Sequence, residues 1–228
     1  MSRIGIITGT RREAACLRTL APSENFRIVC SGADAARARR QAEDLLSGGA
    51  DGLVSFGLAG GIDPGLPSGT VILATSVISQ DGRQGPVSES WRDAMAGDFQ
   101  GAGLAFVSGS VLGVDQAVVD PEPKRLLHTG TGALCVDMES HVVMETARSR
   151  GVPCLVIRAV ADTAEDELPD IAFDAIGNDG GVRGVALAAR LLRNPREISD
   201  VIGLWRASRP AFAALSRVAA LPSLCRPL

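Results

Sequence analysis

Short apolar segments alternate with amphipathic segments along most of this chain, and this alternation constrains the fold more than any other feature of the sequence. Residues 3–8, 26–30 and 52–57 are predicted strands. The intervening residues 11–20 and 33–46 are predicted helices. The run 52–57 is apolar without interruption, which is typical of a strand buried on both faces. Strands and helices that alternate in this way predict an α/β fold.

The middle of the chain departs from the alternation. Residues 70–78 and 104–112 are predicted to be β-segments with no helix between them, and the polar residues 80–101 are predicted to form a surface loop. Residues 57–61 contain three glycines and are predicted to form a tight turn. We therefore expect the sheet to bend or to include antiparallel strands.

The alternation then resumes towards the C-terminus. The remaining predicted elements are helices at residues 121–128, 138–150, 182–193 and about 197–209, and strands at residues 133–136 and 154–160. Together these elements predict a three-layer α/β/α sandwich with a central mixed, partly bent sheet. This domain is expected to span residues 1–194. Residues 195–228 are expected to form a basic amphipathic helical tail, in which Pro210 breaks or restarts the helix.

Charge is distributed unevenly along the chain. Residues 182–228 contain eight arginines and two acidic residues, whereas residues 1–181 contain 15 basic and 24 acidic residues. The tail also repeats apolar residues at helical spacing: Ile198, Val201, Ile202, Trp205, Phe212 and Leu215. Such a helix packs on the body or on a second subunit, or it lies on an anionic membrane surface. Nucleic acid is not an expected partner, because the body is acidic and aromatic residues are not interleaved with the basic ones.

Composition also limits the compartment and the chemistry. The apolar runs are strand-sized and the N-terminal residues lack the apolar core of a signal peptide, so we expect a cytoplasmic protein. Peripheral contact with the inner face of the membrane through the tail stays open. The five cysteines include no C-x-x-C pair and are interpreted as buried free thiols. Since the two histidines form no cluster with them, no metal site is expected.

An acidic residue or a glycine-rich segment follows each of four predicted strands. Glu13 follows the first strand and the turn 57–61 follows the third. Asp137 and Glu139 follow the strand at 133–136, and Asp162 follows the last. Active sites of α/β proteins gather at the carboxyl ends of strands, so these positions are candidates for an active site. Each position also has a structural interpretation, as a helix-start acid, a cap or a tight turn.

The glycine-rich segment does not match the nucleotide-binding motifs. It is not G-x-G-x-x-G, no Gly-Lys-Ser/Thr follows it, and the first strand lacks the dinucleotide pattern too. The sequence therefore lacks the main feature that would predict a dehydrogenase or a P-loop protein.

Four motifs together resemble one known family. The segment Val136-Asp137-Met138-Glu139-Ser140 resembles the V-E-M-E-A/S motif of the purine and uridine phosphorylase superfamily, which includes 5′-methylthioadenosine/S-adenosylhomocysteine nucleosidases. Residues 4–7 with Glu13 behind them, residues 55–61 and residues 156–162 occur in the order that the family shows, and the resemblance covers residues 3–192. The short N-terminal half and the tail most resemble the hopanoid-associated phosphorylases, bacterial proteins linked to removal of adenine from adenosylhopane.

The resemblance implies roles for the strand-end residues. Asp162 would hold a proton for the purine N7, which requires a raised pKa in a dry pocket. Glu139 would bind the ribose hydroxyls, and Met138 would lie against the apolar face of the sugar. Glu13 matches the glutamate that activates water in the nucleosidases. These roles suit cleavage of an N-glycosidic bond, in which the ribose becomes cationic and the base takes up negative charge.

The nucleophile stays open between water and phosphate. Arg158 lies where relatives place an arginine of the nucleophile site, and Arg11 and Arg12 could supply a phosphate clamp. Phosphate would then be a co-substrate, and no other cofactor is expected. Glu13 favours water.

Three positions depart from the family pattern. Leu58 replaces a small hydroxyl residue near the nucleophile, and Ala161 replaces a serine before the acid. The aromatic residue expected to stack on the base is absent, and Val118 and Val119 are the nearest match. Backbone near Gly60 is expected to approach the ligand.

The expected function is therefore cleavage of an adenine nucleoside, with adenosylhopane as the expected substrate. A soluble methylthioadenosine-type nucleosidase and a non-catalytic nucleoside-binding module are the alternatives. The expected partners are a small-molecule or lipid-linked adenine nucleoside and further copies of this chain in a homo-oligomer.

Overall fold

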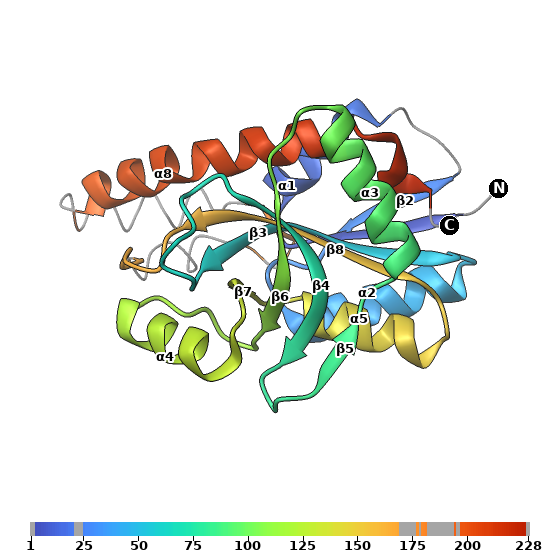
Figure 1. Cartoon of the computed structure of the whole chain (residues 1–228), viewed down its shortest axis with the longest axis horizontal. Coiled ribbons are helices and arrows are strands. Elements are labelled where there is room, and N and C mark those ends of the chain that lie inside the picture. The colour runs from blue at the N-terminus through green and yellow to red at the C-terminus, as the bar shows by residue number, and fades with distance from the viewer. Residues whose placement is uncertain are drawn as a thin grey trace.

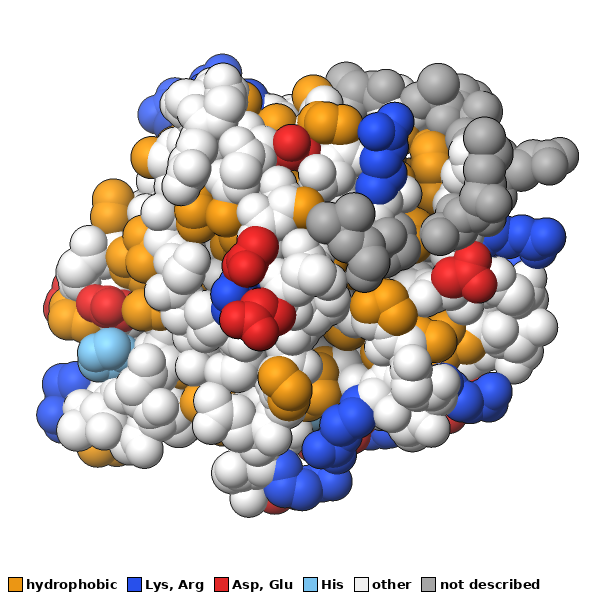
Figure 2. All heavy atoms as spheres, turned by 45° about the vertical axis from the view of Figure 1, so that its right-hand side comes forward, with side chains coloured by type: hydrophobic (Ala, Val, Ile, Leu, Met, Phe, Trp, Pro, Cys, Tyr) orange, Lys and Arg blue, Asp and Glu red, His pale blue; other side chains and the backbone are white. Residues whose placement is uncertain are grey.

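A computed structural model describes residues 3–20, 25–168, 177, 179–181, 194 and 197–226. Figure 1 shows a central sheet with helices on both sides of it, so the predicted three-layer α/β/α fold with a mixed sheet is confirmed. Figure 2 shows acidic and basic side chains scattered over one face among larger uncharged areas. Within the described residues, no helix has both the length and the apolar character needed to cross a membrane.

Eight strands form the sheet within the described part of the chain. Their bounds are β1 Ile4–Thr8, β2 Phe26–Cys30, β3 Gly52–Gly61, β4 Val71–Ser79, β5 Gln84–Pro86, β6 Val107–Gly113, β7 Cys135–Asp137 and β8 Cys154–Asp162. The path runs β2-β1-β3-β7-β6-β4-β5, and β8 pairs with both β3 and β4. Strands β3, β8, β4, β6 and β7 therefore pair in a ring, so the sheet bends far enough to close on itself.

Helices cover the two faces of the sheet (Figure 1). Each of these faces carries a separate apolar core. Their bounds are α1 Arg11–Cys16, α2 Ala35–Ser47, α3 Glu89–Gly101, α4 Pro121–Thr131, α5 Ser140–Ser149 and α8 Glu197–Val218, with short 3₁₀ turns η1 Leu17–Thr19 and η2 Pro222–Cys225. One core joins α1, α3 and α8 to the sheet, and the other joins α2 and α5 to its opposite face. Strands β1, β2, β3 and β8 run parallel to one another, so their carboxyl ends lie at the same edge of the sheet.

The prediction of a tight turn at residues 57–61 is wrong, because these residues continue strand β3. Gly60 and Gly61 pair antiparallel with β7, and β3 also pairs along its length with β8. A β-carbon on Gly61 would lie 3.0 Å from the carbonyl oxygen of Asp162. The glycines thus let two neighbouring strands approach closely, which the sequence pattern does not distinguish from a turn.

The prediction of a surface loop at residues 80–101 is also wrong. That segment contains β5 and helix α3, so a helix does lie between the two long β-segments. The side chains of Trp91, Met95 and Phe99 are fully buried in the core shared with α8. They recur every four residues, a helical spacing that the surrounding polar residues obscure.

The C-terminal tail packs on the body through the second half of helix α8. Helix α8 buries Ala211, Leu215 and Val218 against the sheet. Pro210 lies inside this helix and does not break it, which corrects the prediction. Gly69 makes room for it, because a β-carbon there would lie 2.8 Å from the Pro210 β-carbon. The helix predicted at residues 182–193 lies outside the described residues.

Candidate active site

Two glutamates meet at the carboxyl end of strand β1. Glu13 comes from helix α1 and Glu139 directly precedes helix α5, and both are buried. A β-carbon on Gly9 would lie 2.9 Å from Glu139 Oε1 and 3.1 Å from Glu13 Oε2. The two carboxyl groups therefore converge on the space that the missing Gly9 side chain leaves.

Backbone donors hold the Glu13 carboxylate. The Thr10 N–H donates to Oε2 at 2.5 Å and the Leu58 N–H donates to Oε1 at 2.7 Å. Thr10 and Glu13 form a capping box at the start of α1, so the structural interpretation of Glu13 as a helix-start acid holds as well. Burial raises the pKa of Glu13 above its usual value, while these hydrogen bonds and Arg158 oppose the rise.

Glu139 lies in a more strongly perturbed setting. The Ser31 hydroxyl donates to its Oε1 at 3.1 Å, and no cap bond ties the side chain to the start of α5. Burial, followed by the negative charges of Asp137 and Glu13, raises the pKa of Glu139 to about 8. This group holds a proton near neutral pH in the free protein.

Arg158 is buried, lies close enough to lower the pKa of both glutamates, and already has protein partners. It forms an ion pair with the buried carboxylate of Asp137. Its Nη2 donates to the hydroxyls of Ser55 at 2.5 Å and Ser140 at 2.9 Å, and its Nη1 donates to the Ile157 carbonyl at 3.0 Å. All three guanidinium nitrogens donate to the protein.

The other two arginines predicted for a phosphate site lie apart from the glutamates. Arg11 is exposed and forms an ion pair with Asp179 at 2.7 Å. Arg12 packs against α8, with its guanidinium carbon 3.8 Å from the centre of the Phe212 ring. The structure therefore does not bring Arg11 and Arg12 together around a shared anion site.

The predicted acid Asp162 lies at the end of β8 and is 5% exposed. Its Oδ2 accepts a hydrogen bond from Lys124 Nζ at 2.7 Å. A β-carbon on Gly60 would lie 3.2 Å from that same Oδ2, so Gly60 provides the space for the carboxyl group. Burial raises the pKa of Asp162 above its usual value, and Lys124 opposes that rise.

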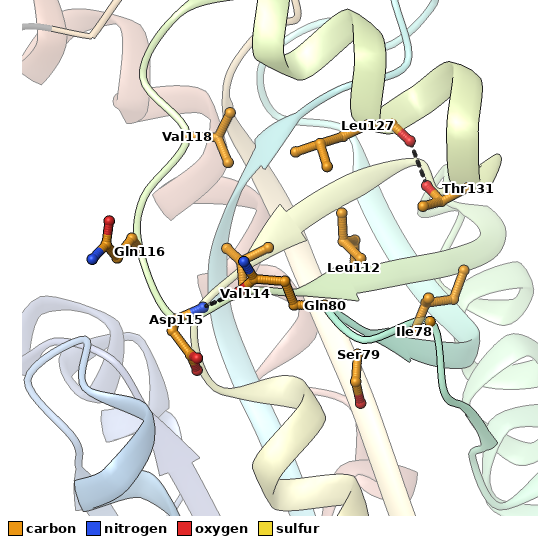
Figure 3. Close-up of a pocket in the computed structure, with 11 residues that line it drawn as sticks. Ile78, Ser79, Gln80, Leu112, Val114, Asp115, Gln116, Val118, Leu127 and Thr131 are labelled. Atoms are coloured by element: carbon orange, nitrogen blue, oxygen red, sulfur yellow. Dashed lines mark hydrogen bonds between the residues drawn. The ribbon is translucent and has the colours of Figure 1, made fainter.

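A cavity of about 430 Å³ with a mixed apolar and polar lining lies at the ends of β4 and β6, and none of the three carboxyl groups lines it. Figure 3 shows Leu112, Val118 and Leu127 among its lining side chains. Val118 and Leu127 also pack in a cluster with Met138, the residue before Glu139. Val119 is tied to the loop after β8, because its carbonyl accepts the Leu168 N–H at 3.0 Å.

Several members of this site are not predicted from the sequence. Lys124 is not among the predicted site residues. It is the only lysine in the chain, and this is the signal in the sequence that could have identified it. Ser31 carries no signal of its own, because isolated serines near strands are common, whereas Ser55 opens the motif at residues 55–61 but has no predicted role. Asp137 was noted as a strand-end acid, but its pairing with Arg158 depends on the bend of the sheet.

Comparisons with known proteins place the chain among relatives with one fold. Residues 6–193 match the family model described as the phosphorylase superfamily. A search of the curated proteins found no match. Among solved structures, the 5′-methylthioadenosine/S-adenosylhomocysteine nucleosidase of Neisseria meningitidis with methylthio-immucillin-A has 18% identity and a TM-score of 0.73, covering 96% of this chain and 97% of that chain.

Two structures from Helicobacter pylori are similar to the same degree. One is a 5′-methylthioadenosine/S-adenosylhomocysteine nucleosidase bound to a pyrrolidine inhibitor, and the other is a futalosine hydrolase. Each has 18% identity and a TM-score of 0.71, and each covers 95% of this chain and 97% of its own. These structures share the fold, and the family model matches well over half of the sequence. The chain belongs to the phosphorylase superfamily.

Proposed function

We propose that this protein cleaves the N-glycosidic bond of an adenine nucleoside and uses water as the nucleophile. The observation that carries the proposal is the convergence of Glu13 and Glu139 on Gly9, at the edge of the sheet where β8 delivers Asp162. Bond cleavage needs one group for the base, one for the ribose and one for the nucleophile, and three buried carboxyl groups at one edge meet that need.

Each carboxyl group has a separate role in this proposal. Asp162 donates a proton to N7 of the departing adenine, and its burial supports this role because burial raises its pKa and so favours the protonated carboxyl group. Glu139 binds the ribose hydroxyls, with Met138 against the sugar. Glu13 accepts a proton from the attacking water, since the Thr10 and Leu58 N–H groups fix its orientation.

The state of the arginines favours water over phosphate. Arg158 is neutralised by Asp137, and Arg11 and Arg12 hold other partners. A phosphate dianion needs uncommitted cationic donors to compensate its desolvation. The proposal therefore includes no cofactor and no phosphate.

We further propose adenosylhopane as the substrate. The resemblance of the sequence to hopanoid-associated phosphorylases supports a large apolar 5′ substituent, and the cluster that contains Val118, Leu127 and Met138 offers it an apolar surface at one wall of the cavity. A methylthioadenosine-type nucleosidase is the second candidate, because two of the similar structures are nucleosidases of that name. Contact with a membrane through α8 and assembly with further copies of the chain belong to this proposal too.

The test measures adenine release from adenosylhopane in mixed micelles and from 5′-methylthioadenosine, each with and without phosphate. Release from the lipid nucleoside without phosphate is the expected result. Release that requires phosphate would overturn the role of Glu13, and preference for 5′-methylthioadenosine would favour the second candidate. Binding of either nucleoside without any adenine release would instead indicate a non-catalytic binding module.

The Asp162→Asn variant tests the proton donor. We expect turnover to fall by roughly 10²- to 10⁴-fold, while the amide oxygen keeps accepting from Lys124 and preserves the fold. Glu165→Gln, on the exposed loop three residues away, is the control and should keep its activity. Near-normal turnover in Asp162→Asn would remove Asp162 from the proposed mechanism.

A further inference from the structure

The chain contains 22 arginines and a single lysine, and that lysine is buried. Lys124 lies in the first turns of α4 with 0% of its surface exposed. A buried ammonium is costly unless charge and hydrogen bonds compensate it. A lone lysine in such a position therefore calls for a specific explanation.

Three oxygens surround the ammonium of Lys124. Nζ donates to Asp162 Oδ2 at 2.7 Å, to the Asp166 carbonyl at 2.7 Å and to the Thr163 carbonyl at 2.9 Å. An ammonium has three protons and can satisfy these three acceptors as a compact point charge, whereas the flat guanidinium of arginine would not fit the same three directions. The arrangement explains why lysine stands here in a chain that otherwise uses arginine.

We propose that Lys124 is a positioning residue for Asp162, holding Oδ2 so that the proton for the substrate is carried on Oδ1 and the charge left after its transfer is stabilised. The inference rests on the proposed cleavage of an adenine nucleoside. Asp162 Oδ2 already accepts from the ammonium, so a proton on the carboxyl group is favoured at the other oxygen.

In the proposed step, the proton of Asp162 moves to the adenine as the glycosidic bond breaks. The Oδ1–H bond of Asp162 breaks and a bond from that proton to purine N7 forms. The electron pair of the glycosidic bond leaves with the base, water forms a bond to the anomeric carbon, and Glu13 takes the proton that the water loses. Asp162 becomes a carboxylate, and Lys124 stabilises this charge at hydrogen-bond distance in a buried setting.

Three titratable groups influence Asp162 within the described residues: Lys124 of α4, Asp166 of the following loop and Cys135 of β7. Lys124 favours the carboxylate, and Asp166 disfavours it. Removing Lys124 therefore raises the pKa of Asp162, and the pH above which turnover declines should move upwards. If Lys124 only anchored α4 to the loop, its removal would not change the pH above which turnover declines.

The kinetic test compares Lys124→Met with Arg125→Met, which removes the neighbouring and exposed positive charge of the same helix. We expect Lys124→Met to lower kcat by at least tenfold, with a smaller change in KM, and to shift the declining limb to higher pH. Arg125→Met should change neither by more than about twofold. A lower kcat with an unshifted limb would overturn the inference while leaving the proposed function intact.

A second measurement does not depend on activity. Protein labelled with ¹³C,¹⁵N-lysine should give one ε-methylene signal, because the chain has one lysine. We expect this signal to shift with pH as Asp162 ionises, and the shift to disappear in Asp162→Asn. A signal that matches free lysine and is unchanged in Asp162→Asn would overturn the contact. If the wild type released no adenine while the signal behaved as expected, the proposed function would fail and the Lys124–Asp162 pairing would stand.

The double variant Lys124→Met/Asp162→Asn keeps the test valid if Lys124→Met folds poorly. It has no carboxylate that can ionise without its ammonium, so above the pH at which Asp162 loses its proton it should fold better than Lys124→Met, and it should stay inactive. Folding no better than Lys124→Met would contradict the proposed pairing.

Discussion

The proposed chemistry depends on groups that burial and close neighbours hold in unusual states. Glu13 and Glu139 approach each other across a glycine, and Asp162 and Lys124 form a buried pair. Unpaired carboxylates would repel each other and lose hydration in this setting. The protonation of each group therefore depends on its neighbours, so changes of a single atom should have measurable effects.

Gly9 offers the smallest such change. A β-carbon in Gly9→Ala would lie 2.9 Å from Glu139 Oε1 and 3.1 Å from Glu13 Oε2, so at least one carboxyl group must move. Misplacement of a catalytic group by about 1 Å can lower turnover about 10²-fold, and we expect kcat to fall by roughly 10- to 100-fold. Gly97→Ala is the matched control, because nothing lies within 4 Å of the added carbon. Equal activity of the two variants would show that the carboxyl groups need no fixed spacing.

The raised pKa of Glu139 makes a prediction about stability. The folded protein keeps the Glu139 proton up to about pH 8, whereas the unfolded chain releases it near the usual value of 4.5. This contribution to the free energy of unfolding is fully present below pH 4.5 and is lost as the pH rises through 8, by at most about 1.4 kcal/mol per pH unit. Between pH 4.5 and pH 8, the free energy of unfolding of Glu139→Gln should therefore fall less than that of wild type. Denaturant titrations at several pH values measure this difference. Glu43→Gln, exposed on α2, should follow wild type, and a Glu139→Gln curve parallel to wild type would contradict the assignment.

Single elements show how far the sequence pattern was sufficient. Strands β1 and β2 match the predicted segments within a residue, because apolar runs bounded by polar residues specify buried strands. Helix α3 is not predicted because Trp91, Met95 and Phe99 are its fully buried residues and most of the others are polar or small, as in a loop. Strand β3 was cut short at its glycines, since their role is to admit β7 and β8, which are distant in sequence.

The same limit applies to the site. Motif order places Glu13, Glu139 and Asp162 at strand ends, where the structure has them. Lys124 contacts Asp162 from α4, 38 residues earlier in the chain, and local sequence patterns do not predict contacts over that separation. Arg12 resembled an anion ligand next to Arg11, yet it packs on Phe212 from the C-terminal helix.

Helix α3 connects the body to the C-terminal turn through Trp91. Its Nε1 donates to the Ser223 carbonyl at 2.7 Å, and its ring is fully buried. Trp91→Phe removes this hydrogen bond and should cost about 1 kcal/mol, while Trp91→Ala also leaves a cavity and should cost about 3–5 kcal/mol. Urea unfolding followed by circular dichroism measures both. Trp205 is 50% exposed, so Trp205→Ala should be much milder, and comparable losses for both tryptophans would be evidence against this packing.

At the scale of the whole molecule, one core extends from the first strand to the last helix. Ile4 and Ile6 of β1, Phe56 of β3 and Leu215 of α8 belong to the same buried cluster. A tail attached only by a linker would leave its apolar face free for a membrane. In this structure the apolar face of the second half of α8 packs against the sheet. Only exposed residues such as Trp205 would be available to contact lipid.

This shared core predicts that α8 unfolds together with the sheet. Leu215→Ala removes a fully buried side chain and should lower the free energy of unfolding by about 2–5 kcal/mol. Arg217→Ala, exposed two residues later, should change it by less than about 0.5 kcal/mol. Hydrogen exchange at increasing urea can follow peptides from β3 and α8 separately. We expect one common midpoint, shifted equally for both peptides in Leu215→Ala, because contacts in one core are lost together. If α8 instead opened at lower urea while β3 kept its protection, the predicted boundary at residues 194 and 195 would separate two units, and the basic helix would be free to bind elsewhere.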